Sequence, residues 1–366
     1  MRPEARAEEP DDFDLFWKKT LADARSHPLE LSARLVDCGL STLEVWDVGF
    51  RGYAGQPVMA WLLLPRQRSV RPLPCVVQYV GYGGGRGLPT DHLLWGSVGY
   101  AHLVMDTRGQ GSETPDLEDC PAEPTGTGFV TRGVLDPHTW YYRRVFTDAV
   151  RAVEAARAHP AVDGTRVAVA GVSQGGGIAL AAAGLDGGTA AALVDVPFLC
   201  GWAEAVRTAE EGPYRELVEL CRQRPDRAIQ ALRTVRYGDG VSFAARASAP
   251  ALFSVALRDR VCPPATVLAA VAAYGGSKRL VNYPFSEHED ASGVRVRVHV
   301  REQIAFLRRL WDAPASSPRF LSDREQPRIT PDGLGHAVNA ISSAGGSGAQ
   351  TGERRRAALP PSTSRR

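Results

Sequence analysis

The chain has 366 residues, of which 44% are hydrophobic, and a formal net charge of +2. A chain of this length can bury roughly three quarters of its unfolded surface, so a globular domain is expected. Arginines after residue 311 supply the positive excess, and the rest is near neutral. This balance argues against nucleic acid or an acidic membrane surface as the main partner.

The two ends of the chain differ in composition from its body. Residues 1–10 are charged and are predicted to be flexible, and no secretion signal or membrane-spanning run of roughly 20 apolar residues is visible. Residues 312–366 are rich in Pro, Ser, Gly and Arg, which predicts a disordered tail, with a basic docking tail as the alternative. The folded domain is therefore expected at 11–311.

The cysteines indicate the compartment. There are six, and they are scattered without a Cys-x-x-Cys pair, so neither a metal site nor a redox motif is predicted. Reduced thiols in the cytoplasm are the expectation.

Apolar periodicity predicts the elements in chain order. Residues 11–24 have helical spacing, and three short β-prone runs follow as an antiparallel entry. Strands then alternate with helices, which predicts an α/β fold with a mostly parallel sheet and helices on both faces. The expected entry strands are 31–38, 43–50 and 57–65, the later strands 75–80, 101–106, 166–171, 191–196, 251–257 and 279–285, and the later helices 140–158, 174–185, 214–223, 265–273 and 294–310.

One serine lies where a predicted strand turns into a predicted helix. In "RVAVAGVSQGGGIAL", Gly171 and Gly175 flank Ser173, and such a turn needs glycine for its strained backbone and close packing. The turn would hold the serine out at the carboxyl edge of the sheet, where functional groups gather. Ser173 is therefore the predicted nucleophile, and an ordinary loop serine is the alternative.

A base and an acid follow the last two predicted strands. His288 comes after the last strand and Asp259 after the one before, which is the Ser, Asp, His order of α/β-hydrolases. The weaker rivals for the base are His92 and His138. Asp195 and Asp106 also end strands and remain alternatives for the acid.

Two backbone N–H groups are predicted to form an oxyanion hole, those of Gln174 and of Tyr82 in "GYGGGRG". A nucleotide-binding loop is disfavoured because these glycines do not complete Gly-x-Gly-x-x-Gly. Tyr82 and Val261 are also expected to contact the substrate. Because Val261 lies two residues after Asp259, we expect it to shorten the acyl pocket, so that acetyl is favoured.

The chain resembles the acetyl xylan esterase and cephalosporin C deacetylase family, carbohydrate esterase family seven, from about Asp11 to Leu310. Its motifs appear as Arg108-Gly-Gln110, Gly171-x-Ser173-Gln174-Gly175 and His288-Glu289, with Val80 where a histidine is common. The resemblance implies an α/β-hydrolase fold and the same triad and oxyanion donors.

The resemblance also implies an activity and an assembly. The implied activity is deacetylation of acetylated xylo-oligosaccharides and cephalosporin C, with no metal or cofactor. The implied assembly is a hexamer with inward-facing sites, in which the stretch between Arg108 and Trp140 makes subunit contacts. The alternatives are a peptidase, which shares the fold and triad, an esterase acting on another small acyl ester, and a binding protein with an inactive triad.

Overall fold

The computed structural model describes residues 9–67, 72–111, 113–118, 128–288 and 294–311. These residues belong to one compact unit that ends at Ala313. The predicted tail, residues 312–366, and residues 1–8 of the predicted flexible terminus lie outside the described ranges. Glu9, the first described residue, pairs with Arg246 at 2.8 Å.

A nine-stranded sheet in the order β1-β2-β3-β5-β4-β6-β7-β8-β9 forms the centre of this unit. The pairs β1–β2, β2–β3 and β3–β5 are antiparallel, and the pairs from β5–β4 to β8–β9 are parallel. The strands are β1 (Ser32–Val36), β2 (Leu43–Arg51), β3 (Pro57–Pro65), β4 (Leu73–Tyr79), β5 (Ala101–Met105), β6 (Val162–Val172), β7 (Ala191–Asp195), β8 (Ala251–Ala256) and β9 (Lys278–Tyr283). The predicted antiparallel entry and parallel body are therefore confirmed.

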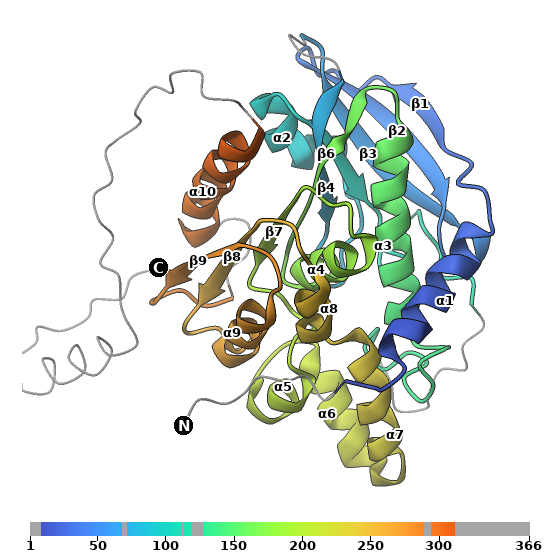
Figure 1. Ribbon diagram of the computed structural model, residues 1–366, viewed down its shortest axis with the longest axis vertical. Helices are drawn as coiled ribbons and strands as arrows, with labels where there is room; N and C mark the ends of the chain where they lie inside the picture. Colours follow the sequence, from blue (N-terminus) through green and yellow to red (C-terminus); the bar gives the residue numbers. More distant parts are fainter. Residues whose placement is uncertain (1–8, 68–71, 112, 119–127, 289–293, 312–366) are drawn as a thin grey trace, which may run out of the picture. The chain divides into compact units, whose positions relative to one another are not determined.

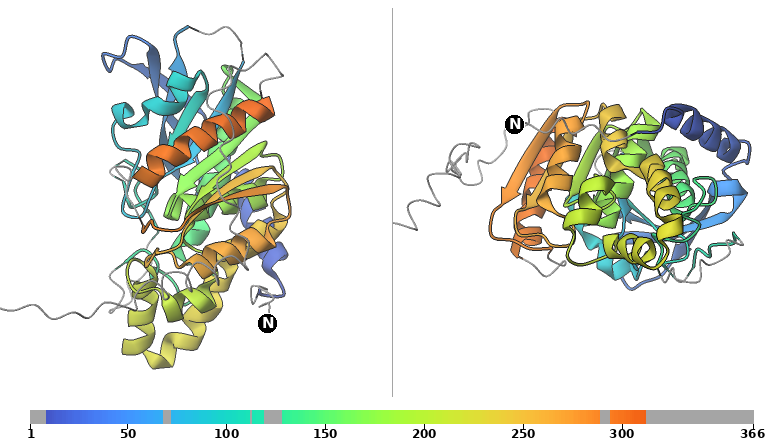
Figure 2. Two further views of the ribbon diagram at one scale, coloured as in Figure 1. Left: turned by 90° about the vertical axis from the view of Figure 1, so that its left-hand side faces the viewer. Right: turned by 90° about the horizontal axis from the view of Figure 1, so that it is seen from below.

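Helices cover both faces of the sheet (Figures 1 and 2). The α-helices are α1 (Phe13–Arg25), α2 (Leu93–Val98), α3 (Tyr141–Ala158), α4 (Gln174–Asp186), α5 (Trp202–Thr208), α6 (Tyr214–Gln223), α7 (Pro225–Val235), α8 (Gly240–Arg246), α9 (Pro264–Ala273) and α10 (Val294–Trp311), and three short 3₁₀ segments are η1 (Tyr53–Gly55), η2 (Pro89–His92) and η3 (Arg236–Gly238). None of the helices within the described ranges is long and apolar enough to cross a membrane.

Alternating side chains build a core on each face of the sheet. Along β4, Cys75 and Val77 join the larger core, while Val76 between them joins the smaller one. Because successive residues of a strand point to opposite faces, these two cores lie on opposite sides of the sheet. Helices α3, α4 and α8 pack on the larger core, and α10 lies across the other face, as the left view of Figure 2 shows.

All the predicted elements occur within a few residues of their expected ends, but four helices were missed: α2, α5, α7 and α8. Three of them have six or seven residues, too short for helical periodicity to stand out from the background. The missed α5 and α7 flank the predicted α6, and Figure 1 shows these three helices together at the lower end of the view. They lie between β7 and β8 in the chain.

Candidate active site

Ser173 occupies a sharp turn between β6 and α4. Its backbone has φ 56° and ψ −119°, a conformation that costs a non-glycine residue on the order of 1–3 kcal/mol. The surrounding backbone holds it there, because Ser173 N donates to Asp195 O at 3.0 Å and Phe198 N donates to Ser173 O at 2.9 Å. The strand-turn-helix context predicted for the serine is therefore present.

The two glycines that flank Ser173 are required by close packing. A Cβ at Gly171 would overlap the backbone of Gly175, and a Cβ at Gly175 would overlap the carbonyl oxygen of Tyr79. Glycine is thus needed here because no side chain fits between the end of β6, the first turn of α4 and the end of β4.

The structure brings Ser173, His288 and Asp259 into one hydrogen-bonded chain. His288 Nε2 lies 2.9 Å from Ser173 Oγ, and His288 Nδ1 lies 2.8 Å from Asp259 Oδ2. The other oxygen of Asp259 accepts hydrogen bonds from Val261 N at 2.9 Å and Cys262 N at 2.7 Å. A serine with a neighbouring imidazole, itself oriented by a carboxylate, is the arrangement that activates a hydroxyl nucleophile.

The rival acids and bases lie elsewhere. Asp106 accepts hydrogen bonds from the backbone of Arg86 and Thr114, and Asp195 pairs with His299. His92 bonds to the carbonyl of Arg86, and the ring of His138 packs against Phe16. None of these four side chains contacts the Ser173 hydroxyl.

The loop after β4 carries the predicted donor Tyr82. The Tyr82 hydroxyl is bonded to the carboxylate of Glu216 on α6, and it accepts a hydrogen bond from Phe129 N at 2.8 Å. Glu216 also accepts from Val130 N at 3.1 Å, and burial raises the pKa of its carboxyl group. Within the described ranges the backbone N–H groups of Tyr82 and Gln174 donate to no protein acceptor, so they are available to a ligand.

Val261 follows the triad aspartate as predicted and is half-buried. Its side chain reaches Gly212, just before α6, where an added Cβ would overlap a Val261 methyl group. The segment containing α5 and α6 therefore adjoins the triad through Val261. Whether the valine limits the acyl group stays a prediction.

Three further residues adjoin the site without having been singled out from the sequence: Gln110, Glu216 and Cys262. Gln110 is bonded to Gln174, and it appeared in the sequence only as a letter of a motif. Glu216 lies on a predicted helix with no local signal, because its partner Tyr82 is 134 residues away. Such contacts depend on tertiary folding.

Cys262 is buried beside the triad. Its donor atom and those of Asp259 and His288 lie within 4.8 Å of one another, close enough in principle to hold a metal ion. Burial raises the pKa of the Cys262 thiol well above its ordinary value, and a metal would have to displace the Asp259–His288 hydrogen bond. Asp259 and His288 are already bonded to each other, and Cys262 N donates to Asp259.

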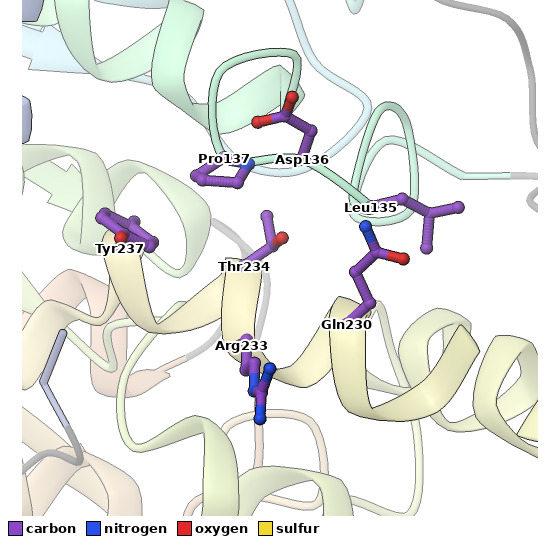
Figure 3. A pocket seen from close by; sticks show the side chains of 7 residues that line it. All are labelled: Leu135, Asp136, Pro137, Gln230, Arg233, Thr234 and Tyr237. Carbon is purple, nitrogen blue, oxygen red and sulfur yellow. The ribbon is translucent and has the colours of Figure 1, made fainter. Parts of the chain in front are cut away.

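A pocket of about 350 Å³ lies away from these residues, between the turn at 135–137 and α7 (Figure 3). In Figure 3, Asp136 and Pro137 lie across from Thr234 and Tyr237. None of the lining residues bonds to Ser173, Asp259 or His288, so this pocket is separate from the candidate site.

Comparisons with known proteins agree with this geometry. Residues 2–308 match the model of the family described as acetyl xylan esterase (AXE1). A solved acetyl xylan esterase from Paenibacillus sp. R4 is 37% identical, with a TM-score of 0.78 over 83% of this chain and 96% of that one. Acetyl xylan esterase 1 from Thermoanaerobacterium sp. JW/SL YS485 is 27% identical, with a TM-score of 0.77 over 84% of this chain and 96% of that one.

A curated relative is longer. The acetyl esterase Axe7A from Xylanibacter ruminicola is 27% identical over 285 residues, which make up 76% of this chain and 63% of Axe7A. The chain thus spans less than two thirds of the length of that relative. The family match nevertheless covers most of the chain, and the fold and the strand-turn-helix serine accompany it. The chain belongs to the acetyl xylan esterase (AXE1) family and has the α/β-hydrolase fold.

Proposed function

We propose that the protein is a serine esterase that removes acetyl groups from small substrates, such as acetylated xylo-oligosaccharides and cephalosporin C. The observation that carries the proposal is the hydrogen-bonded chain from Asp259 through His288 to Ser173, with its serine on the strained turn after β6. The names of the matched relatives, which are acetyl esterases, support the acetyl group as the one removed.

The first half of the reaction forms an acetyl-enzyme. Ser173 Oγ attacks the carbonyl carbon of the acetyl ester while His288 Nε2 takes the hydroxyl proton. The carbonyl oxygen becomes an oxyanion, which accepts hydrogen bonds from the N–H groups of Tyr82 and Gln174. The intermediate then expels the alcohol, which receives the proton from His288, and the acetyl group stays on Ser173.

The second half releases acetate. His288 takes a proton from a water molecule, whose oxygen attacks the acetyl carbonyl carbon. The new tetrahedral intermediate expels Ser173 Oγ, and His288 returns the proton to it. Asp259 holds the imidazole in the required orientation and stabilises its positive charge in both halves. Side chains, two backbone N–H groups and water supply every group in this route, so the proposal includes no metal or cofactor.

The predicted substrate contacts favour a small acyl group. Val261 lies between the triad aspartate and Gly212, and we propose that it closes the acyl side of the site. Acetyl would fit against it better than longer chains.

The proposal also covers the protein's organisation. We assign the activity to residues 11–311 and propose that residues 312–366 are dispensable, because their composition cannot form a core. On the family resemblance we propose a homohexamer with inward-facing sites, and on the cysteine spacing a cytoplasmic location. Truncation after Asp312 tests whether the tail is dispensable, and light scattering of the purified protein tests the homohexamer.

The deciding experiment compares three substrates. Wild type and Ser173→Ala are assayed with p-nitrophenyl acetate, cephalosporin C and a proline peptide amide. We expect wild type to hydrolyse the two acetyl esters and Ser173→Ala to lose about 10⁴-fold or more of that activity while staying folded. Cleavage of the amide alone would indicate a peptidase, and an inactive wild type would indicate a binding protein.

A further inference from the structure

We propose that the Gln174 side chain, locked by Gln110, aims the Tyr82 N–H group at the oxyanion. Gln174 would then serve the oxyanion hole twice, once through its own backbone N–H and once as a positioning residue for the other donor. The inference rests on the proposed esterase function and deepens it.

The peptide bond between Gly81 and Tyr82 is held through its carbonyl oxygen. Gln174 Nε2 lies 3.2 Å from Gly81 O and 3.4 Å from Val80 O. In a trans peptide the C=O and the following N–H lie in one plane and point in opposite directions. A hydrogen bond that holds Gly81 O therefore fixes the direction in which Tyr82 N–H points.

The backbone on the other flank of Tyr82 is held by Gln110. Gly83 N donates a hydrogen bond of 2.7 Å to Gln110 Oε1. Gln110 and Gln174 bond to each other twice, with Gln110 Nε2 donating to Gln174 Oε1 at 2.8 Å and Gln174 Nε2 donating to Gln110 Oε1 at 3.0 Å. One pair of side-chain amides thus holds the backbone on both sides of Tyr82.

Side-chain packing does not hold the two glycines that flank Tyr82. A Cβ added at Gly81 or at Gly83 would meet nothing within 4 Å, and Gly83 has φ 75°. Glycines in open space leave the backbone free to rotate. Gly84 N donates to Gly81 O at 3.2 Å within the turn, and the hydrogen bonds from Gln174 and Gln110 add the side-chain constraint on these peptide planes that packing at the two glycines does not supply.

The amide pair of Gln110 and Gln174 is itself held rigidly. Gln174 is fully buried, and its Oε1 also accepts a hydrogen bond of 2.9 Å from the Tyr142 hydroxyl. Gln110 Nε2 donates in addition to the Tyr141 hydroxyl at 3.0 Å. Because both tyrosines lie in the first turn of α3, the amides are fixed to a helix that packs on β6.

The test uses variants that keep the backbone donors and remove the amides. Gln174→Met and Gln110→Met retain side-chain length. Tyr274→Phe is the matched control, because it removes one buried hydrogen bond, to Ala249 O at 2.8 Å, that involves neither amide. Each is assayed with p-nitrophenyl acetate and with p-nitrophenyl thionoacetate, in which sulfur replaces the carbonyl oxygen. Sulfur is a weak hydrogen-bond acceptor, so the thionoester depends less on the N–H donors.

We expect both methionine variants to lower kcat on the acetate roughly 10- to 100-fold, somewhat less than the loss of an entire oxyanion donor. KM should stay within about twofold, because the interaction is made in the transition state. The thionoester should lose much less, so that the preference for oxygen over sulfur falls. Tyr274→Phe should keep both the rate and this preference.

Three results would overturn the inference while leaving the esterase function in place: unchanged kcat in both methionine variants, equal losses on the two esters, or the same loss in Tyr274→Phe. If Gln174→Met does not fold, Gln110→Met decides the question, because Gln110 is only half-buried. An inactive wild type would instead contradict the proposed function itself.

Discussion

Two aspartate–histidine pairs lie at the carboxyl ends of neighbouring strands, and they have different surroundings. Asp259 follows β8 and lies 2.8 Å from His288 Nδ1, whereas Asp195 ends β7 and lies 2.6 Å from His299 Nε2. The His288 side chain is 20% exposed and the His299 side chain is fully buried. The same two residue types thus form one pair at the site surface and one in the interior.

The third partner of each pair accounts for the difference. His288 uses its other nitrogen for the Ser173 hydroxyl, while His299 uses its other nitrogen for the Tyr283 hydroxyl at 3.0 Å. Asp195 also accepts a hydrogen bond of 3.1 Å from Gln303 on α10. Asp195 Oδ1 and His299 Nε2 lie 2.6 Å apart, although this contact is not aligned for a hydrogen bond. The inner pair therefore attaches α10 to the sheet.

A carboxylate–imidazole pair therefore has no fixed role in this protein. Contact with solvent and with a reactive hydroxyl makes the outer pair suited to proton transfer, whereas enclosure makes the inner pair suited to holding a helix. Substitutions should separate the two roles, since the outer pair should affect rate and the inner pair stability.

The largest effect is expected for Asp259→Asn. The amide would still accept the hydrogen bonds from Val261 N and Cys262 N, but it would favour the wrong imidazole tautomer. We expect kcat to fall about 10⁴-fold, as such substitutions do in serine triads, with little change in melting temperature. Assays with p-nitrophenyl acetate beside thermal unfolding check this, and a large loss of stability with a normal rate would reverse the assignment.

The next largest effect is expected for His299→Ala. It would remove the buried imidazole beside the Asp195 carboxylate and leave a cavity there, which costs about 3 kcal/mol or more of the free energy of unfolding. Denaturant unfolding measures this cost, and kcat of the folded fraction should stay within a few-fold of wild type. The double variant Asp195→Asn/His299→Ala is the control, because it removes the unpaired charge and should recover part of the lost stability.

A smaller effect is expected when the acyl chain of the ester is lengthened, because Val261 lies in the loop that carries Asp259 of the outer pair. Each methylene forced against Val261 should cost on the order of 1–3 kcal/mol, which lowers the rate roughly 5- to 150-fold. The measurement is kcat/KM for acetyl, propionyl and butyryl p-nitrophenyl esters in wild type and Val261→Ala. Alanine keeps the N–H that bonds Asp259, so an unchanged butyryl-to-acetyl ratio would clear Val261 of this role.

The smallest effect is expected from thiol reagents. Burial raises the pKa of Cys262 well above its ordinary value and that of Cys75 to about 12, so both remain thiols at neutral pH. Only the thiolate reacts, so iodoacetamide at pH 8 should label half-buried Cys38 before either of them and leave the activity intact. Labelling should speed up as the pH rises. Rapid inactivation at pH 8, prevented by Cys262→Ser, would contradict this expectation.

The sequence by itself determined the alternation of strands and helices and the turn at Ser173. Apolar periodicity indicates which faces of an element are buried, and Gly171 and Gly175 mark positions where a side chain would overlap the neighbouring backbone. Both signals lie within a few residues of the structure that they predict. The positions of His288 and Asp259 after consecutive strands followed from chain order alone, because parallel strands end at the same edge of the sheet.

Only the tertiary structure decided which aspartate faces His288 and which faces His299. Asp195 and Asp259 both follow buried strands, and the choice between them depends on α10, which places His299 over Asp195. Likewise, Gln110 and Gln174 are 64 residues apart, and Tyr82 and Glu216 are 134 apart. No local pattern predicts such contacts, because they form only where loops from separate strand ends are packed together.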